Sequence, residues 1–259
     1  MSPLSCLVAT SHLIIFYGNQ KQGVMLELLT TKSKPVILAP MVGYSHLPFR
    51  LLCRKYGAEL AVTPMIHSKC YYQQPKYRSN YKFDDTPIAQ ICGNSVEHVL
   101  NSARLLEPHC SAIDLNLGCP QQIASRGNYG AFLMEKPEVV SALVEALCKN
   151  INVPISCKVR IFDKFEDTLK WCLMLQNSGA KLITVHGRTR GQRGQRSGLA
   201  DWKQIKRIKQ ELTVPVVANG NILYSDDIKR VFDYTQCDGL EIAETALVFI
   251  IYVVSSRCI

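Results

Sequence analysis

The chain has no cysteine pair spaced as Cys-x-x-Cys, and its eleven cysteines are an odd number. Neither a disulfide framework nor a structural zinc site is therefore supported, and we expect no bound metal. No stretch reaches the roughly 18 to 20 uninterrupted apolar residues that a membrane-spanning helix needs, so no membrane association is expected. Free thiols predict a reducing compartment, the cytoplasm, with the nucleus as a second location.

Disorder is also excluded, because 47% of the 259 residues are hydrophobic and only 20% are charged. The segment Leu4 to Phe16 is apolar enough to resemble the hydrophobic part of a secretory signal. However, no basic residue precedes it, and Thr10, Ser11 and His12 interrupt it. We interpret residues 1–34 as an N-terminal extension, with a targeting segment as the alternative.

Acidic residues are in short supply, which leaves a formal net charge of +9. Much of the excess lies in one stretch that contains a single acid, Asp201. Its basic residues are Arg188, Arg190, Arg193, Arg196, Lys203, Lys206, Arg207 and Lys209. Such a stretch is typical of a surface that binds a polyanion, although a solvated loop and helix face has the same composition.

From Pro35 onward, short β-branched runs alternate with segments of helical periodicity, which is typical of βα units and a parallel sheet. Eight strands are predicted: Val36 to Ala39, Leu60 to Thr63, Ile88 to Ile91, Ala112 to Leu115, Ile155 to Val159, Leu182 to Val185, Val216 to Ala218 and Gly239 to Ile242. Eight such units favour an α/β fold of the TIM (β/α)8 barrel type, and an open Rossmann sheet is the alternative. Ser225 is the predicted N-cap of the last helix, which should begin at Asp226.

Unusual polar residues follow the predicted strands, where the catalytic groups of such barrels lie. One group of motifs includes Asp114-Leu115-Asn116-Leu117-Gly118-Cys119-Pro120-Gln121 and Arg126-Gly127-Asn128-Tyr129-Gly130-Ala131. Shorter motifs at other strand ends are Ala39-Pro40-Met41-Val42, Lys158-Val159-Arg160, Val185-His186-Gly187-Arg188-Thr189 and Asn219-Gly220-Asn221. In this order they resemble the tRNA-dihydrouridine synthases, and the subgroup resembled is the eukaryotic one that acts at the 16/17 sites of the D-loop.

The resemblance implies an FMN-dependent oxidoreductase that uses NADPH to reduce the C5=C6 bond of a uridine in tRNA to dihydrouridine. It implies one catalytic residue, Cys119, as the acid that protonates C5. The cofactor-binding residues implied are Ala39, Pro40, Met41, Gln90, Lys158, His186, Asn219, Gly220, Asn221, Ala243 and Glu244. The substrate-binding residues implied are Asn116, Arg160 and Arg188.

The chemistry of these residues agrees with the roles, although each has a plainer interpretation. A thiol with an ordinary pKa of about 8.5 is mostly protonated at neutral pH and can donate a proton, yet most cysteines are small buried hydrophobes. Lys158 supplies a fixed cation that would stabilise a reduced flavin, or it is a lysine at the barrel rim. Asn116 can orient a uracil edge, or it satisfies loop backbone.

Beyond Ala243-Glu244 the sequence departs from the family pattern, because an apolar run replaces the expected glycine-containing phosphate loop and helix. We expect a catalytic domain at residues 35–244 whose last βα unit is incomplete. A divergent apolar tail is expected at 245–259, with the family's C-terminal helical RNA-binding domain absent. Two alternatives stay open: an FMN barrel that reduces free pyrimidines, and a catalytically silent chain that binds at most RNA or a partner. The sequence does not indicate an oligomeric state.

Overall fold

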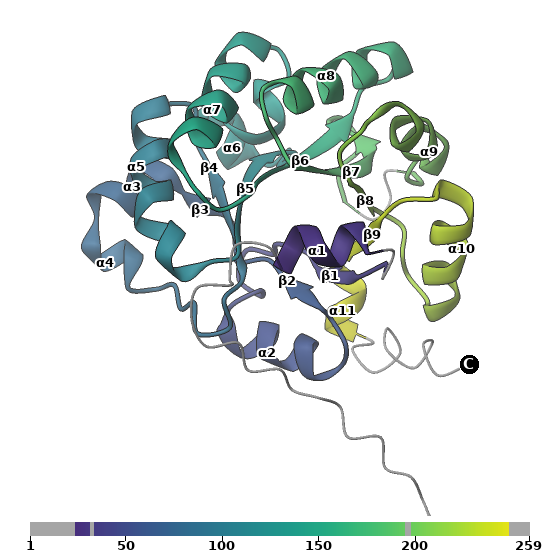
Figure 1. The fold of residues 1–259 in the computed structure, drawn as a ribbon, viewed down its shortest axis with the longest axis horizontal. Helices are drawn as coiled ribbons and strands as arrows, with labels where there is room; N and C mark the ends of the chain where they lie inside the picture. The colour runs from purple at the N-terminus through teal and green to yellow at the C-terminus, as the bar shows by residue number, and fades with distance from the viewer. Residues whose placement is uncertain (1–23, 32–33, 195–197, 249–259) are drawn as a thin grey trace, which may run out of the picture.

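A computed structural model describes residues 24–31, 34–194 and 198–248. Within these ranges all strand pairs are parallel, and helices surround the strands (Figure 1). The strands are β1 (Val36–Leu38), β2 (Leu60–Ala61), β3 (Ile66–His67), β4 (Ile88–Cys92), β5 (Ala112–Leu117), β6 (Ile155–Ile161), β7 (Leu182–Thr189), β8 (Val216–Asn219) and β9 (Gly239–Ile242).

The strands close into a barrel. Their order is β2-β1-β9-β8-β7-β6-β5-β4-β3, and a parallel bridge between Val62 and Ile88 joins the β2 segment to β4. The peptide N–H of Thr63 also donates to the carbonyl of Ile88 over 3.0 Å. Pro64 separates β2 from β3 because proline has no N–H to donate to a ladder. The predicted TIM barrel is therefore confirmed over an open sheet, with β2 and β3 as two parts of its second strand.

Helices lie in the connections between strands, as the periodicity predicts, and two more lie before the first strand and after the last one of the described residues. They are α1 (Val24–Thr30), α2 (Leu47–Lys55), α3 (Ser68–Gln73), α4 (Pro75–Arg78), α5 (Val96–Leu106), α6 (Gln122–Gly127), α7 (Pro137–Asn150), α8 (Phe165–Asn177), α9 (Trp202–Glu211), α10 (Ser225–Thr235) and α11 (Glu244–Val248). The prediction of Ser225 as the N-cap of α10 is wrong, since Ser225 is already helical and Tyr224 is the N-cap. The Asp227 carboxylate accepts from the N–H groups of Leu223 and Tyr224, so it organises this turn from inside the helix.

Helix α1 covers the opening at the amino ends of the strands, where Figure 1 shows it across the barrel. Met25 and Leu29 are buried there in a hydrophobic cluster with Leu60, Ile88 and other residues at the strand starts. A Cβ on Gly239 would lie 2.9 Å from Leu29 Cδ2, so α1 packs closely against the start of β9. Part of the predicted extension thus belongs to the barrel core, whereas Leu4 to Phe16 lies outside the described residues.

The segment after β9 begins with a short helix. Helix α11 starts at Glu244, and the Thr245 hydroxyl anchors it by donating to the Ile222 carbonyl over 2.6 Å. Most of the predicted tail, residues 249–259, lies outside the described part of the chain. The domain boundaries themselves stay predictions.

Candidate active site

A cavity of about 350 Å³ opens at the carboxyl ends of β7, β8 and β9. Predicted cofactor residues and Arg188 line it: His186, Asn219, Gly220, Asn221, Ala243 and Glu244. Its size falls within the usual range of small-molecule sites. Ala39 adjoins this rim, because its N–H donates to the Ile242 carbonyl. The N–H of Met41 donates to the Ser45 hydroxyl oxygen over 2.9 Å. Pro40 lies between them in the chain.

On the β4–β5 side, a buried chain of amides and one carboxylate crosses the barrel interior. Gln90 Nε2 donates to Asp114 Oδ2 over 2.8 Å, and Gln90 Oε1 accepts from Asn116 Nδ2 over 2.8 Å. The Ser156 hydroxyl donates to the other Asp114 oxygen. Both ends of the Gln90 amide are therefore engaged within the protein.

Asp114 is the charged member of this network. Burial, more than any neighbour, raises the pKa of Asp114 to about 6, while hydrogen bonds from Gln90 and Ser156 oppose the shift. Glu241 raises the pKa of Asp114 further, because it is a second carboxylate in the same interior. The carboxyl group therefore titrates near neutral pH and fixes the orientation of Gln90.

Asn116 shapes the loop that carries Cys119. Its Oδ1 accepts from the N–H groups of Gly118 (3.1 Å) and Cys119 (2.9 Å), so the side chain caps the turn after β5. Its Nδ2 donates a hydrogen bond to Gln90 Oε1. These three contacts of Asn116 are all internal, which is the loop-backbone role that the sequence left open as the alternative.

Cys119 is partly buried on this loop, and burial raises the pKa of its thiol. The thiol is therefore protonated at neutral pH. Gly130 has a φ of +63°, and a Cβ there would lie 2.7 Å from the Cys119 carbonyl oxygen. The glycine-containing motif after Cys119 is needed because the backbone of residue 130 passes directly over the cysteine.

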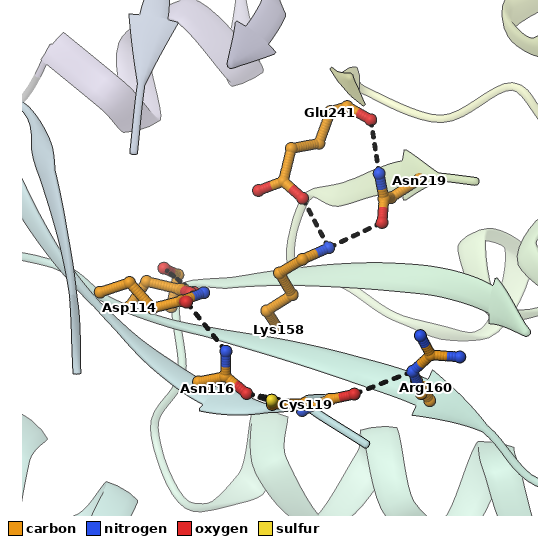
Figure 2. A network of polar contacts seen from close by, with 10 residues as sticks. Asp114, Asn116, Cys119, Lys158, Arg160, Asn219 and Glu241 are labelled. Carbon is orange, nitrogen blue, oxygen red and sulfur yellow. Dashed lines mark hydrogen bonds and ion pairs between the residues drawn. The ribbon is translucent and has the colours of Figure 1, made fainter. Parts of the chain in front are cut away.

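Lys158 projects from β6 toward Asn219 and Glu241, and away from Cys119 (Figure 2). Its ammonium group donates to Asn219 Oδ1 over 2.8 Å and forms an ion pair with Glu241 Oε2 at 2.6 Å. The Asn219 amide in turn donates to the Glu241 carbonyl over 2.7 Å. Side chains of two strands, β8 and β9, thus hold the lysine head group in one place.

His186 lies against the turn after β8. Burial is the main reason that its pKa falls to about 2, and the cations Lys158, Arg160 and Arg188 lower it further. The imidazole is therefore neutral at physiological pH. A Cβ on Gly220, whose φ is +109°, would lie 2.7 Å from the ring, so glycine keeps this side of the cavity open.

The two predicted substrate arginines differ in their surroundings. Arg160 is buried, and its guanidinium donates to the carbonyls of Gly118, Thr189 and Gln192 at 2.8 to 3.0 Å. It therefore braces the Cys119 loop against the loop after β7. Arg188 lines the cavity and donates to the Gly198 carbonyl at the molecular surface.

Comparison with known proteins decides the family. The model of the family described as dihydrouridine synthase (Dus) matches residues 37–248, which includes all of the described strands except Val36, the first residue of β1. This chain belongs to the dihydrouridine synthase family. The predicted membership is thereby confirmed.

Two fungal members of the family are named tRNA-dihydrouridine(16/17) synthase [NAD(P)(+)]. The protein from Saccharomyces cerevisiae is 45% identical over 217 residues, and that from Schizosaccharomyces pombe is 41% identical over 219 residues. These alignments cover 80% and 82% of this chain but 51% and 55% of the relatives. The chain spans about half the length of the curated relatives it matches. A human relative of the 20a/20b type shares 36% identity, so the similarity supports the predicted 16/17 subgroup.

A solved structure shows the same fold in a more distant protein. The 2-naphthoyl-CoA reductase complex aligns with a TM-score of 0.60 over 86% of this chain and 49% of its own, at 8% sequence identity. At this identity the likeness concerns the fold alone.

In this dihydrouridine synthase family member, sequence reasoning missed three polar residues of the interior: Asp114 as a site residue, Ser156 and Glu241. The sequence pattern that could have found them is a polar residue between apolar neighbours inside a predicted strand, as in Gly239–Ile242.

Across residues 24–31, 34–194 and 198–248, no helix is long and apolar enough to cross a membrane. Among those same residues, no cluster of three His, Cys, Asp or Glu side chains could hold a metal ion.

Proposed function

We propose that this chain is an FMN-dependent tRNA-dihydrouridine synthase that uses NADPH to reduce a uridine of the D-loop, at the 16/17 sites. The observation that carries the proposal is that a protonated thiol, Cys119, follows β5 at the same carboxyl-end rim of the barrel that carries the Lys158–Asn219 pair and the cavity. Family membership and the names of the fungal relatives support the same reaction.

The cavity fits the FMN group that the family resemblance implies. Gly220 and Asn221 line the cavity in a turn with positive φ at both residues, and a Cβ at Gly220 would collide with His186 and Ala200 beside it. A turn of this kind is suited to presenting backbone N–H groups to a phosphate. Lys158 and the neutral His186 supply hydrogen-bond donors beside it. We assign FMN contacts to these residues, to Asn219, Ala243 and Glu244, and to the rim segment Ala39–Pro40–Met41.

When bound, FMN supplies reducing equivalents from NADPH to the C5=C6 bond. The protein must then deliver a proton to C5 of the uracil ring. Cys119 can do this because burial raises the pKa of its thiol, so the proton is present at physiological pH. Asn116 and Arg160 hold the loop of Cys119 and act as positioning residues.

The basic loop after β7 is assigned to the tRNA backbone. Arg188 lies at the cavity rim, and Arg190 packs over Phe132 while it pairs with Glu135. Arginine side chains on an exposed loop suit phosphate groups, because a guanidinium donates several hydrogen bonds at once. Gln90 is assigned to the cofactor site indirectly, because it is fully buried and its amide fixes Asn116 within the network of Asp114.

The test is incubation of the purified chain with FMN, NADPH and unmodified tRNA transcript, followed by mass spectrometry of the digested tRNA. The proposal expects dihydrouridine in the tRNA, at most two residues per D-loop, and none without NADPH. Reduction of free uracil but not of tRNA would favour the free-pyrimidine reductase instead. Tight tRNA binding without bound flavin or product would favour the catalytically silent RNA binder.

A further inference from the structure

Glu241 is a carboxylate inside the barrel that the proposed reaction does not use. It lies on β9, is 3% exposed, and is one of the cavity-lining residues. Its position in the register is opposite Asn219 of β8, and both side chains reach the Lys158 ammonium group, which Figure 2 shows. A buried carboxylate needs such a partner, because an isolated buried charge is strongly disfavoured.

The ion pair has a consequence for the cavity. Lys158 contacts Asn219 and Glu241, two residues that line the cavity assigned to FMN, and Glu241 compensates its charge at 2.6 Å. A compensated cation attracts a further negative charge less strongly than an uncompensated one. A flavin ring is neutral when oxidised and can carry a negative charge when reduced, so the two forms respond differently to this compensation.

We infer that Glu241 is a positioning residue that fixes the Lys158 ammonium and sets how strongly the site distinguishes reduced from oxidised FMN. Glu241 holds the ammonium on the β8–β9 side of the barrel and moderates its pull on the reduced flavin. The inference rests on the proposed function, because it takes FMN as the ligand of the cavity.

The test compares the parent with Glu241→Gln, which keeps the size of the side chain and removes its charge. Calorimetric titration with oxidised FMN, and with dithionite-reduced FMN under argon, gives the ratio of the two dissociation constants. We expect Glu241→Gln to shift this ratio at least about tenfold in favour of reduced FMN, the equivalent of one pKa unit of charge interaction. Glu135→Gln is the matched control, since it removes one acid from the exposed Arg190 pair and should leave the ratio unchanged.

Two further variants separate positioning from a general structural effect. Glu241→Asp retains the charge and should keep the ratio near the parental value. In a Lys158→Met background, Glu241→Gln should no longer shift the ratio, because the effect acts through the lysine. An unchanged ratio in Glu241→Gln, or an equal shift with and without Lys158, would overturn the inference.

A measurement without flavin keeps this inference distinguishable from the proposed function. Reductive methylation of the flavin-free protein, followed by peptide mass spectrometry, reports how firmly Lys158 is held. Lys158 should react faster in Glu241→Gln than in the parent or in Glu135→Gln. Equal rates of Lys158 methylation in Glu241→Gln and in the parent would contradict the positioning role, even if FMN binds. Faster methylation in a protein that does not bind FMN would contradict the proposed function and the flavin part of the inference.

Discussion

Replacing Asn116 with alanine should loosen the Cys119 loop and destabilise the barrel together. The substitution removes three hydrogen bonds: those from the N–H groups of Gly118 and Cys119, and the one to Gln90 Oε1. Gln90 is fully buried, so its carbonyl would lose a partner that water does not readily replace, at a cost of about 2 kcal/mol. The two loop N–H groups are partly accessible, and together they add about 1 to 2 kcal/mol.

We therefore expect Asn116→Ala to lower the free energy of unfolding by about 3 to 4 kcal/mol in urea titrations. Cys119 should also be alkylated faster by iodoacetamide, as measured on its peptide by mass spectrometry. Asn116→Asp is the matched comparison, because it retains the acceptor for the loop but loses the donor to Gln90. It should be destabilised while Cys119 keeps its parental alkylation rate. A loss below about 1 kcal/mol in Asn116→Ala with unchanged alkylation would refute this reasoning.

Three other expectations concern stability and the loop. The pKa of Asp114 is raised from 3.8 to about 6 in the folded protein, so its proton stabilises the fold fully only below pH 3.8, and this contribution is lost as the pH rises through 6. Relative to Asp114→Asn, the parent should lose about 2 kcal/mol between pH 4 and 7.5 in urea titrations. Gly130→Ala, at a φ of +63°, should cost about 1 to 3 kcal/mol and change the alkylation rate of Cys119, and wild-type values for both would contradict the close approach. Met25→Ala should cost about 2 to 5 kcal/mol in the same titration if α1 is part of the core, whereas a near-zero cost would show that it is not.

The barrel was predictable from sequence because its strands are short β-branched runs spaced by helical segments. The division of the second strand into β2 and β3 was not evident, although Pro64 gives its physical reason. Helix α1 was also missed, since its seven residues become informative only when Met25 and Leu29 meet the strand starts.

The candidate site was predictable to the extent that single residue types reveal chemistry. Cys119 between Gly118 and Pro120, and Lys158 on a strand, stand out on their own. The pairing of Lys158 with Glu241 did not, because the partners are far apart in the chain and meet only across the barrel. For the same reason the sequence could not show that the Arg160 guanidinium donates hydrogen bonds to three loop carbonyls.

The most direct test of the proposed chemistry compares the parent with Cys119→Ala in two half-reactions. Stopped-flow absorbance follows flavin reduction by NADPH, and mass spectrometry follows dihydrouridine formed on unmodified tRNA. Cys148→Ala serves as the control, since Cys148 is a partly buried cysteine on α7. We expect Cys119→Ala to reduce its flavin at the parental rate and to form no dihydrouridine, while Cys148→Ala does both. Dihydrouridine formation by Cys119→Ala at the parental rate would contradict the assignment of Cys119 as the acid.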